Sequence, residues 1–239
     1  MGSGKIPWVK LLAFDTSTQW LTVACGDGAT WCAHGEPGGQ GHSERLLPIV
    51  DEVLSKAGWM LSDLDGIAFG AGPGSFTGVR IACGVAQGLG LGSDVPLIPV
   101  STLEGLAQHA WRTHGAARVV ACLDARMREV YAGSYQRDAT GWVERRAPVV
   151  RKPADVEAHA SGERWFGTGD GFASYPELAT RMQLAAVDAV AVPDARSIAE
   201  LALPRLMAGE GTDPALSLPI YVRHRVALTT LERDAGERL

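Results

Sequence analysis

The segment Ile67-Ala-Phe-Gly-Ala-Gly-Pro-Gly-Ser-Phe-Thr-Gly-Val-Arg-Ile-Ala82 reads as a buried strand, a glycine-proline turn and the first half of a helix. The helix continues to about residue 92 and contains many glycines, namely Gly78, Gly84, Gly88, Gly90 and Gly92. Each of them costs roughly 1 kcal/mol relative to alanine in a helix interior. The sequence therefore predicts that another backbone packs closely against this helix, either within one domain or from another protein chain.

Small residues recur along this helix at intervals of four, which places them on shared faces. One series consists of Gly84, Gly88 and Gly92. The other consists of Gly74, Gly78, Ala82 and Ala86. Each series predicts a flat surface without long side chains.

The glycine-rich turn before the helix matches no common ligand-binding loop. A phosphate loop needs a lysine after its last glycine, but Gly78 is followed by Val79. A dinucleotide-binding turn needs a third glycine where Thr77 stands. A nucleophile elbow needs glycine two residues before and after its serine, whereas Pro73 and Thr77 flank Ser75. Ser75 or Thr77 is instead predicted to cap the helix.

Composition is that of a globular protein. The 239 residues are 46% hydrophobic, and the formal net charge of −5 argues against a basic surface that holds nucleic acid unaided. The cysteines show no Cys-x-x-Cys spacing, which predicts reduced thiols and a cytoplasmic protein. No apolar run is long enough to span a membrane. The start lacks a secretory signal, and residues 2–4 resemble a cloning remnant.

A weak internal repeat divides the chain. An apolar strand at residues 9–14 ends at Asp15, and another at residues 118–123 ends at Asp124. In both cases a second apolar strand begins six residues after the aspartate, and a third follows it. This pattern predicts a duplicated α/β fold with two similar halves.

The remaining elements follow from apolar periodicity. Ser43 is predicted to cap a helix that ends at Gly58, and short buried strands are predicted at residues 67–70 and 97–100. Further helices are predicted at residues 102–112, 154–159, 176–182 and 197–208. The first half is expected to span residues 1–104 and the second residues 105–239, with the last segment packing back on the first half. The tail after Thr230 is polar.

Several motifs together resemble the TsaB (YeaZ) family over about residues 9–231. They are Asp15-Thr-Ser-Thr18, His42-Ser-Glu-Arg-Leu-Leu-Pro48, Gly72-Pro-Gly-Ser-Phe-Thr-Gly-Val-Arg-Ile81, Val100-Ser-Thr102, Asp124-Ala-Arg126, Glu129-Val-Tyr131 and Pro219-Ile-Tyr-Val-Arg223. The resemblance implies an actin-like, sugar-kinase-like (ASKHA) fold, in agreement with the repeat. It also implies a scaffold in the threonylcarbamoylation of the adenosine beside the tRNA anticodon. The implied partners are the catalytic paralogue TsaD and the ATPase TsaE, with tRNA contacted only indirectly.

The residues favour a non-catalytic role. The two metal-binding histidines of TsaD correspond by position to Thr102 and Leu106, and leucine cannot bind a metal. We therefore expect no metal site and no catalytic residues. The alternative is an ATP-binding kinase or hydrolase of the same fold.

Nucleotide binding stays open at two turns, because actin-like ATPases hold phosphates in a turn after each first strand. The candidate residues are Asp15, Thr16, Ser17, Asp124 and Arg126. The second turn lacks the glycines that let a backbone wrap around phosphate. The role favoured for both aspartates is simply to cap their turns. We expect no cofactor other than ATP or ADP, which could bind weakly or at an interface with a partner.

The partner interface is expected on the two helices that follow Ser43 and Ser75. The candidate contact residues are Ser43, Leu46, Leu47, Val50, Leu54, Gly78, Ala82, Cys83 and Ala86. Because TsaD shares the fold, the same surface can also pair with a second copy of this chain.

Overall fold

The computed structural model describes residues 9–39, 41–159 and 163–222, and its ten strands form two five-stranded sheets. The first sheet contains β1 (Leu11–Asp15), β2 (Trp20–Gly26), β3 (Trp31–Pro37), β4 (Gly66–Gly72) and β5 (Leu97–Ser101). The second contains β6 (Arg118–Arg126), β7 (Glu129–Asp138), β8 (Gly141–Arg151), β9 (Phe166–Thr168) and β10 (Ala186–Asp188). The expectations for residues 1–8, for Arg223 and for the tail after Thr230 lie outside the described residues.

The two sheets have the same topology, which confirms the predicted duplication. The strand order is β3-β2-β1-β4-β5 in the first sheet and β8-β7-β6-β9-β10 in the second. In each sheet the first three strands are antiparallel neighbours, and the last two run parallel to the central first strand. Asp15 and Asp124 both lie near the end of that central strand, just before the turn into the next one. They therefore occupy equivalent turns.

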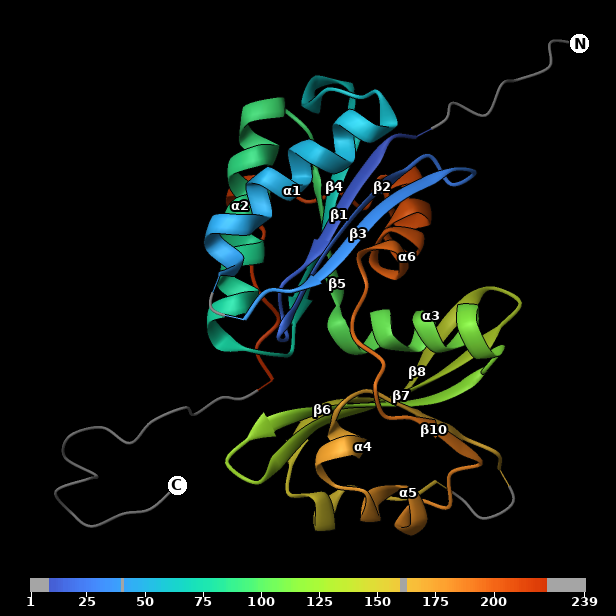
Figure 1. Ribbon diagram of the computed structural model, residues 1–239. Coiled ribbons are helices and arrows are strands. Elements are labelled where there is room, and N and C mark those ends of the chain that lie inside the picture. The colour runs from blue at the N-terminus through green and yellow to red at the C-terminus, as the bar shows by residue number, and fades with distance from the viewer. Residues whose placement is uncertain (1–8, 40, 160–162, 223–239) are drawn as a thin grey trace, which may run out of the picture.

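Helices cover both faces of the first sheet (Figure 1). One face carries α1 (His42–Ala57) and α2 (Phe76–Ser93), whose apolar side chains pack with Phe14 and Phe69. The other face carries α6 (Ala195–Met207). Although α6 comes late in the chain, it packs on β1 and β4 of the first sheet.

The second sheet is covered in the same manner. Helix α3 (Thr102–His114) packs on one face and lies between the two sheets in Figure 1. The short helices α4 (Gly171–Ser174) and α5 (Glu177–Arg181) cover the opposite face. Single 3₁₀ turns occur at η1 (Leu61–Asp63), η2 (Pro153–Asp155) and η3 (Pro214–Leu216). The expected division between residues 104 and 105 falls inside α3.

The glycines of α2 have two different roles. A Cβ atom on Gly78 would lie 1.9 Å from the carbonyl oxygen of Thr16, so this position requires glycine. The Thr16 hydroxyl also donates a 2.7 Å hydrogen bond to the Gly78 carbonyl, which ties the helix to the β1–β2 turn. In contrast, Cβ atoms on Gly84, Gly88 and Gly92 would meet nothing within 4 Å. That series faces open space.

The two predicted helix caps can be compared directly with the structure. The Ser75 hydroxyl accepts a hydrogen bond from the amide of Gly78, so the predicted cap of α2 is confirmed. The predicted Ser43 cap is wrong, because α1 begins at His42 behind Gly41 and has no side-chain cap.

The helix predicted at residues 154–159 is also wrong. Only the single turn η2 forms there. A helix of only six residues would leave most of its carbonyl oxygens without an intrahelical partner. The guanidinium groups of Arg146 and Arg181 bind carbonyl oxygens of residues 153–158 instead.

Candidate functional site

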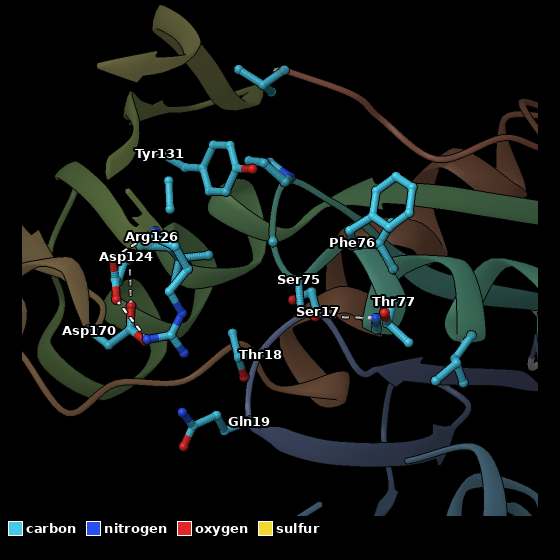
Figure 2. A pocket seen from close by; sticks show the side chains of 18 of the residues that line it. Ser17, Thr18, Gln19, Ser75, Phe76, Thr77, Asp124, Arg126, Tyr131 and Asp170 are labelled. Carbon is cyan, nitrogen blue, oxygen red and sulfur yellow. Dashed lines mark hydrogen bonds and ion pairs between the residues drawn. The ribbon is translucent and has the colours of Figure 1, made fainter. Parts of the chain in front are cut away.

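A cleft of about 730 Å³ lies between the two halves of the fold, and we take it as the candidate site. Figure 2 shows residues of the β1–β2 turn, the start of α2 and the β6–β7 hairpin facing it. The chain segment at residues 220–222 completes the lining from far along the sequence. The cleft thus gathers the two turns that were predicted to be equivalent.

The first aspartate lies beneath the cleft rather than in it. Asp15 is 1% exposed, and its Oδ1 accepts hydrogen bonds from the amide and the hydroxyl of Ser17, at 2.8 and 2.7 Å. Its Oδ2 has no hydrogen-bond partner among the described residues and lies against Gly70. Burial raises the pKa of Asp15 to about 6, against the opposing effect of the Ser17 hydrogen bonds. Asp15 and Thr16 do not line the cleft, whereas Ser17 does.

The second aspartate is exposed to the cleft and already paired. Asp124 Oδ1 accepts a hydrogen bond from the amide of Arg126, and its Oδ2 lies 3.1 Å from the Arg126 guanidinium. The amide of Asp124 donates to Oδ1 of Asp170, as Figure 2 shows. Burial raises the pKa of Asp170. Each aspartate therefore forms the capped turn that was one of its two expected roles.

The β6–β7 hairpin has an unusual backbone. Arg126, Met127 and Arg128 adopt φ angles of 61°, 52° and 59°. The left-handed region costs roughly 1–2 kcal/mol for a residue other than glycine. From the sequence, the missing glycines were taken to disfavour wrapping of this backbone around phosphate. The hairpin forms a tight left-handed turn without them and places Arg126 beside the cleft.

Two groups of cleft residues were missed as site residues by sequence reasoning. His42 is buried, its ring bonds to the backbone of Gln19, and its Nε2 has no partner among the described residues. Burial lowers the pKa of His42, which keeps the ring neutral near pH 7. Phe76 and Tyr221 place their ring centroids 6.4 Å apart at the other side of the cleft. His42 and Tyr221 both belonged to family motifs, but nothing local in the sequence indicated that Tyr221 would lie at this cleft.

Comparison with known proteins places the chain in a family. The family model described as "TsaD: tRNA N6-adenosine threonylcarbamoyltransferase" matches residues 33–218. The chain is 41% identical over 224 residues to the "tRNA threonylcarbamoyladenosine biosynthesis protein TsaB" of Escherichia coli (strain K12), covering 92% of this chain and 96% of that protein. The chain belongs to the TsaB (YeaZ) family. The TsaB of Haemophilus influenzae is 38% identical, with 91% and 95% of the two chains covered.

Solved structures of TsaB-family proteins share the whole fold. The structure titled "YeaZ from Pseudomonas aeruginosa" has a TM-score of 0.84 and 42% identity, and covers 89% of this chain and 99% of its own. A second Pseudomonas aeruginosa structure, described as similar to peptidase YEAZ, has a TM-score of 0.85 at 42% identity, with coverage of 90% and 100%.

In this TsaB-family chain, most of the residues predicted to face a partner are buried in its own core. They are Leu46, Val50, Leu54, Gly78, Ala82, Cys83 and Ala86. The apolar stripe of α1 and the Gly78 series of α2 face the first sheet, because that contact removes them from water in the single chain. Only Ser43 and Leu47 of the predicted set are exposed. The outward face of α2 is the Gly84 series instead.

The two residues that were matched from the sequence to the TsaD histidines are core residues. Thr102 and Leu106 are both fully buried at the start of α3. Among residues 9–39, 41–159 and 163–222, no group of three or more His, Cys, Asp or Glu side chains is arranged to hold a metal ion. No described helix is long and apolar enough to cross a membrane.

Proposed function

We propose that this chain is a non-catalytic scaffold subunit of tRNA threonylcarbamoyladenosine biosynthesis in the cytoplasm. In this proposal it binds a TsaD-like paralogue, which works with a TsaE-like ATPase and contacts the tRNA itself. The relatives named TsaB, which the chain matches over more than nine tenths of its length, support the pathway. The observation that carries the scaffold role is the open glycine face of α2.

The outer face of α1 and α2 offers a surface for close helix packing. The two helices share one face of the first sheet (Figure 1), and Gly84 and Gly88 leave their outward side flat. Leu47 on α1 and Leu91 on α2 expose 48% and 61% of their surface. Small residues flanked by exposed leucines allow helix axes to approach closely and bury apolar area. A related chain with the same fold can present matching helices, and so can a second copy of this chain.

The cleft supports a role without catalysis. One aspartate is buried below the cleft, and the other is neutralised by Arg126. A reaction would need a nucleophile or base that can reach a substrate. The carboxylates that the fold brings to this place are instead committed to holding their own turns.

An ATP-binding kinase or hydrolase is the second candidate. The meeting of both turns in one large cleft, with Arg126 beside it, is the observation that favours it. Isothermal titration with ATP and magnesium on the isolated chain separates the candidates. Tight binding that is lost in Arg126→Ala, together with turnover, would favour the enzyme. The scaffold proposal expects at most weak binding and no turnover.

Two arginine substitutions test the interface. Gly84→Arg and Gly88→Arg each replace an exposed helix glycine, so each should stabilise the isolated chain by up to about 1 kcal/mol. The same charges would be buried without partners in the complex, which should weaken binding of the TsaD-like paralogue by at least about 30-fold. The matched control is Ala139→Arg, an exposed position in the β7–β8 turn of the other half. Unchanged affinity of both glycine variants would place the interface elsewhere.

A further inference from the structure

A second, smaller pocket lies on the outer face of the second sheet, away from the cleft and from α1 and α2. Its volume is about 310 Å³, within the range of small-ligand sites. The floor consists of buried apolar side chains of β6, β7, the segment after β8 and the C-terminal end of α5, namely Val120, Ala132, Val156 and Met182. In Figure 1 this is the face of the sheet that carries α4 and α5. A small apolar group that enters this pocket would bury its surface away from water, which favours binding.

Two buried polar atoms of the pocket lining have no hydrogen-bond partner among the described residues: the hydroxyl of Ser134 in the floor, and Nε2 of His159, whose ring stacks on Trp165. Ser134 is 2% exposed, and its hydroxyl forms no hydrogen bond with any described residue. Ser134 lies on β7 opposite Val120 on one side and Arg146 on the other, so it shares the face of the floor residues. A buried hydroxyl without a partner is costly. A ligand that brings its own hydroxyl to this point would remove the cost.

The pocket lining carries two arginines and two acids, and one arginine and one acid of these already lie close together. Arg151 and Asp155 both line the pocket, and neither has an ion pair with another described residue. The other acid at the rim, Glu157, lies 3.8 Å from Arg146. Arg151 pairs with Val130 across the strands, four residues along β7 from Ser134, which is about 13 Å by strand rise. An arginine side chain and a ligand of amino-acid length together span that distance.

The segment above the pocket is held in place by two arginines. Arg146 donates hydrogen bonds to the carbonyls of Glu157 and Ala158, and Arg181 donates to those of Pro153, Ala154 and Val156. Residues 153–158 thus form a fixed wall although they contain only a single 3₁₀ turn. The pocket is preformed by these contacts rather than created by a ligand.

We propose that this pocket is a binding site for a free α-amino acid with a hydroxylated aromatic side chain. The ligand carboxylate would pair with Arg151 and its ammonium group with Asp155. Its ring would lie on the apolar floor, and its hydroxyl would bond to Ser134. This proposal does not depend on the proposed function, because the pocket shares no residue with the cleft or with the outer face of α2.

L-tyrosine and L-phenylalanine differ only by the hydroxyl. The affinities of these two ligands for the wild type and for Ser134→Ala form a thermodynamic cycle that isolates the contact between the two hydroxyls. We would measure binding to the full chain by saturation-transfer NMR, since a ligand this small should bind in the millimolar range. The wild type should bind L-tyrosine about five- to tenfold more tightly than L-phenylalanine, and Ser134→Ala should remove that preference. Arg151→Gln and Asp155→Asn should each weaken both amino acids about tenfold.

The melting temperature of each variant shows, separately from binding, whether the variant is folded. Ser134→Ala deletes no hydrogen bond of the described structure and removes an unpartnered buried hydroxyl, so its melting temperature should equal or exceed that of the wild type. The exposed control Ser62→Ala should leave the melting temperature unchanged. The proposal is overturned if neither amino acid binds, or if Ser134→Ala weakens both ligands equally. It is also overturned if the rim variants bind as the wild type does.

Discussion

The buried carboxylate of Asp15 should make the protein less stable near neutral pH than an amide would. Burial is the main cause that raises the pKa of Asp15 to about 6, well above that of an exposed aspartate. Since a tenfold change in proton affinity corresponds to about 1.4 kcal/mol, ionised Asp15 costs roughly 3 kcal/mol of folding free energy at pH 7. Asp15→Asn should stabilise the chain, because the amide oxygen can still accept the two Ser17 hydrogen bonds.

The sign of the pH dependence follows from the direction of the shift. A raised carboxyl pKa means that the folded state holds the proton more tightly than the unfolded state does. Stability contributed through Asp15 therefore falls as pH rises from about 4 to about 6 and is constant above that range. The advantage of Asp15→Asn should be largest near pH 7 and should shrink towards pH 4.

Urea or thermal unfolding at several pH values measures this effect. The Asn amide nitrogen takes the place of an unpartnered oxygen, which reduces the expected gain to about 1–3 kcal/mol near pH 7, or about 2–10 °C in melting temperature. Asp124→Asn is the matched control at the equivalent turn, where the pair with exposed Arg126 should contribute less than about 1 kcal/mol. If Asp15→Asn destabilised the chain, or if its effect did not change with pH, the argument from burial would be refuted.

Three further outcomes follow from the packing of the helices. Gly78→Ala should destabilise by about 3 kcal/mol or more, since its Cβ would meet the Thr16 carbonyl, whereas Gly84→Ala should stabilise by about 1 kcal/mol; chemical denaturation of the pair measures both. Val50→Glu and Ala82→Arg should unfold the chain rather than only prevent partner binding, as circular dichroism would show. Burial raises the pKa of Asp194, but the contacts with His109 and Arg112 outweigh burial and lower that pKa to about 2. Asp194→Ala should therefore cost about 2–4 kcal/mol of folding free energy near pH 7 and less below pH 4, as urea unfolding at both pH values would show.

The duplicated fold could be predicted because its signal is local and occurs twice. The strand, aspartate and turn spacing around Asp15 recurs around Asp124, and strand pairing follows the same order in both halves. The Ser75 cap is likewise encoded within four residues. Features of this kind depend on residues close together in the sequence, so they can be predicted without knowing which elements pack against a helix.

The outward face of α2 could not be predicted in this way. Gly78, Ala82 and Ala86 form a series of small residues very similar to that of Gly84 and Gly88. Tertiary contacts decide which series is buried, since Gly78 lies against Thr16 and the two alanines pack in the core. The apolar stripe of α1 was ambiguous for the same reason, because a core face and an interface face have the same spacing. The cleft presents a third case, since its lining joins the two turns to residues 220–222, which lie far along the chain from both.

The first turn links the candidate cleft to the proposed interface. The carbonyl of Ser17 accepts a 2.7 Å hydrogen bond from the amide of Ser75, and the Thr16 hydroxyl binds the carbonyl of Gly78. Both contacts fix the start of α2, the helix whose opposite face carries Gly84 and Gly88. Asp15 in turn fixes the position of Ser17. The turn whose sequence resembles a phosphate-binding turn thus holds the start of α2 in place, and the scaffold role proposed above would use it in this way.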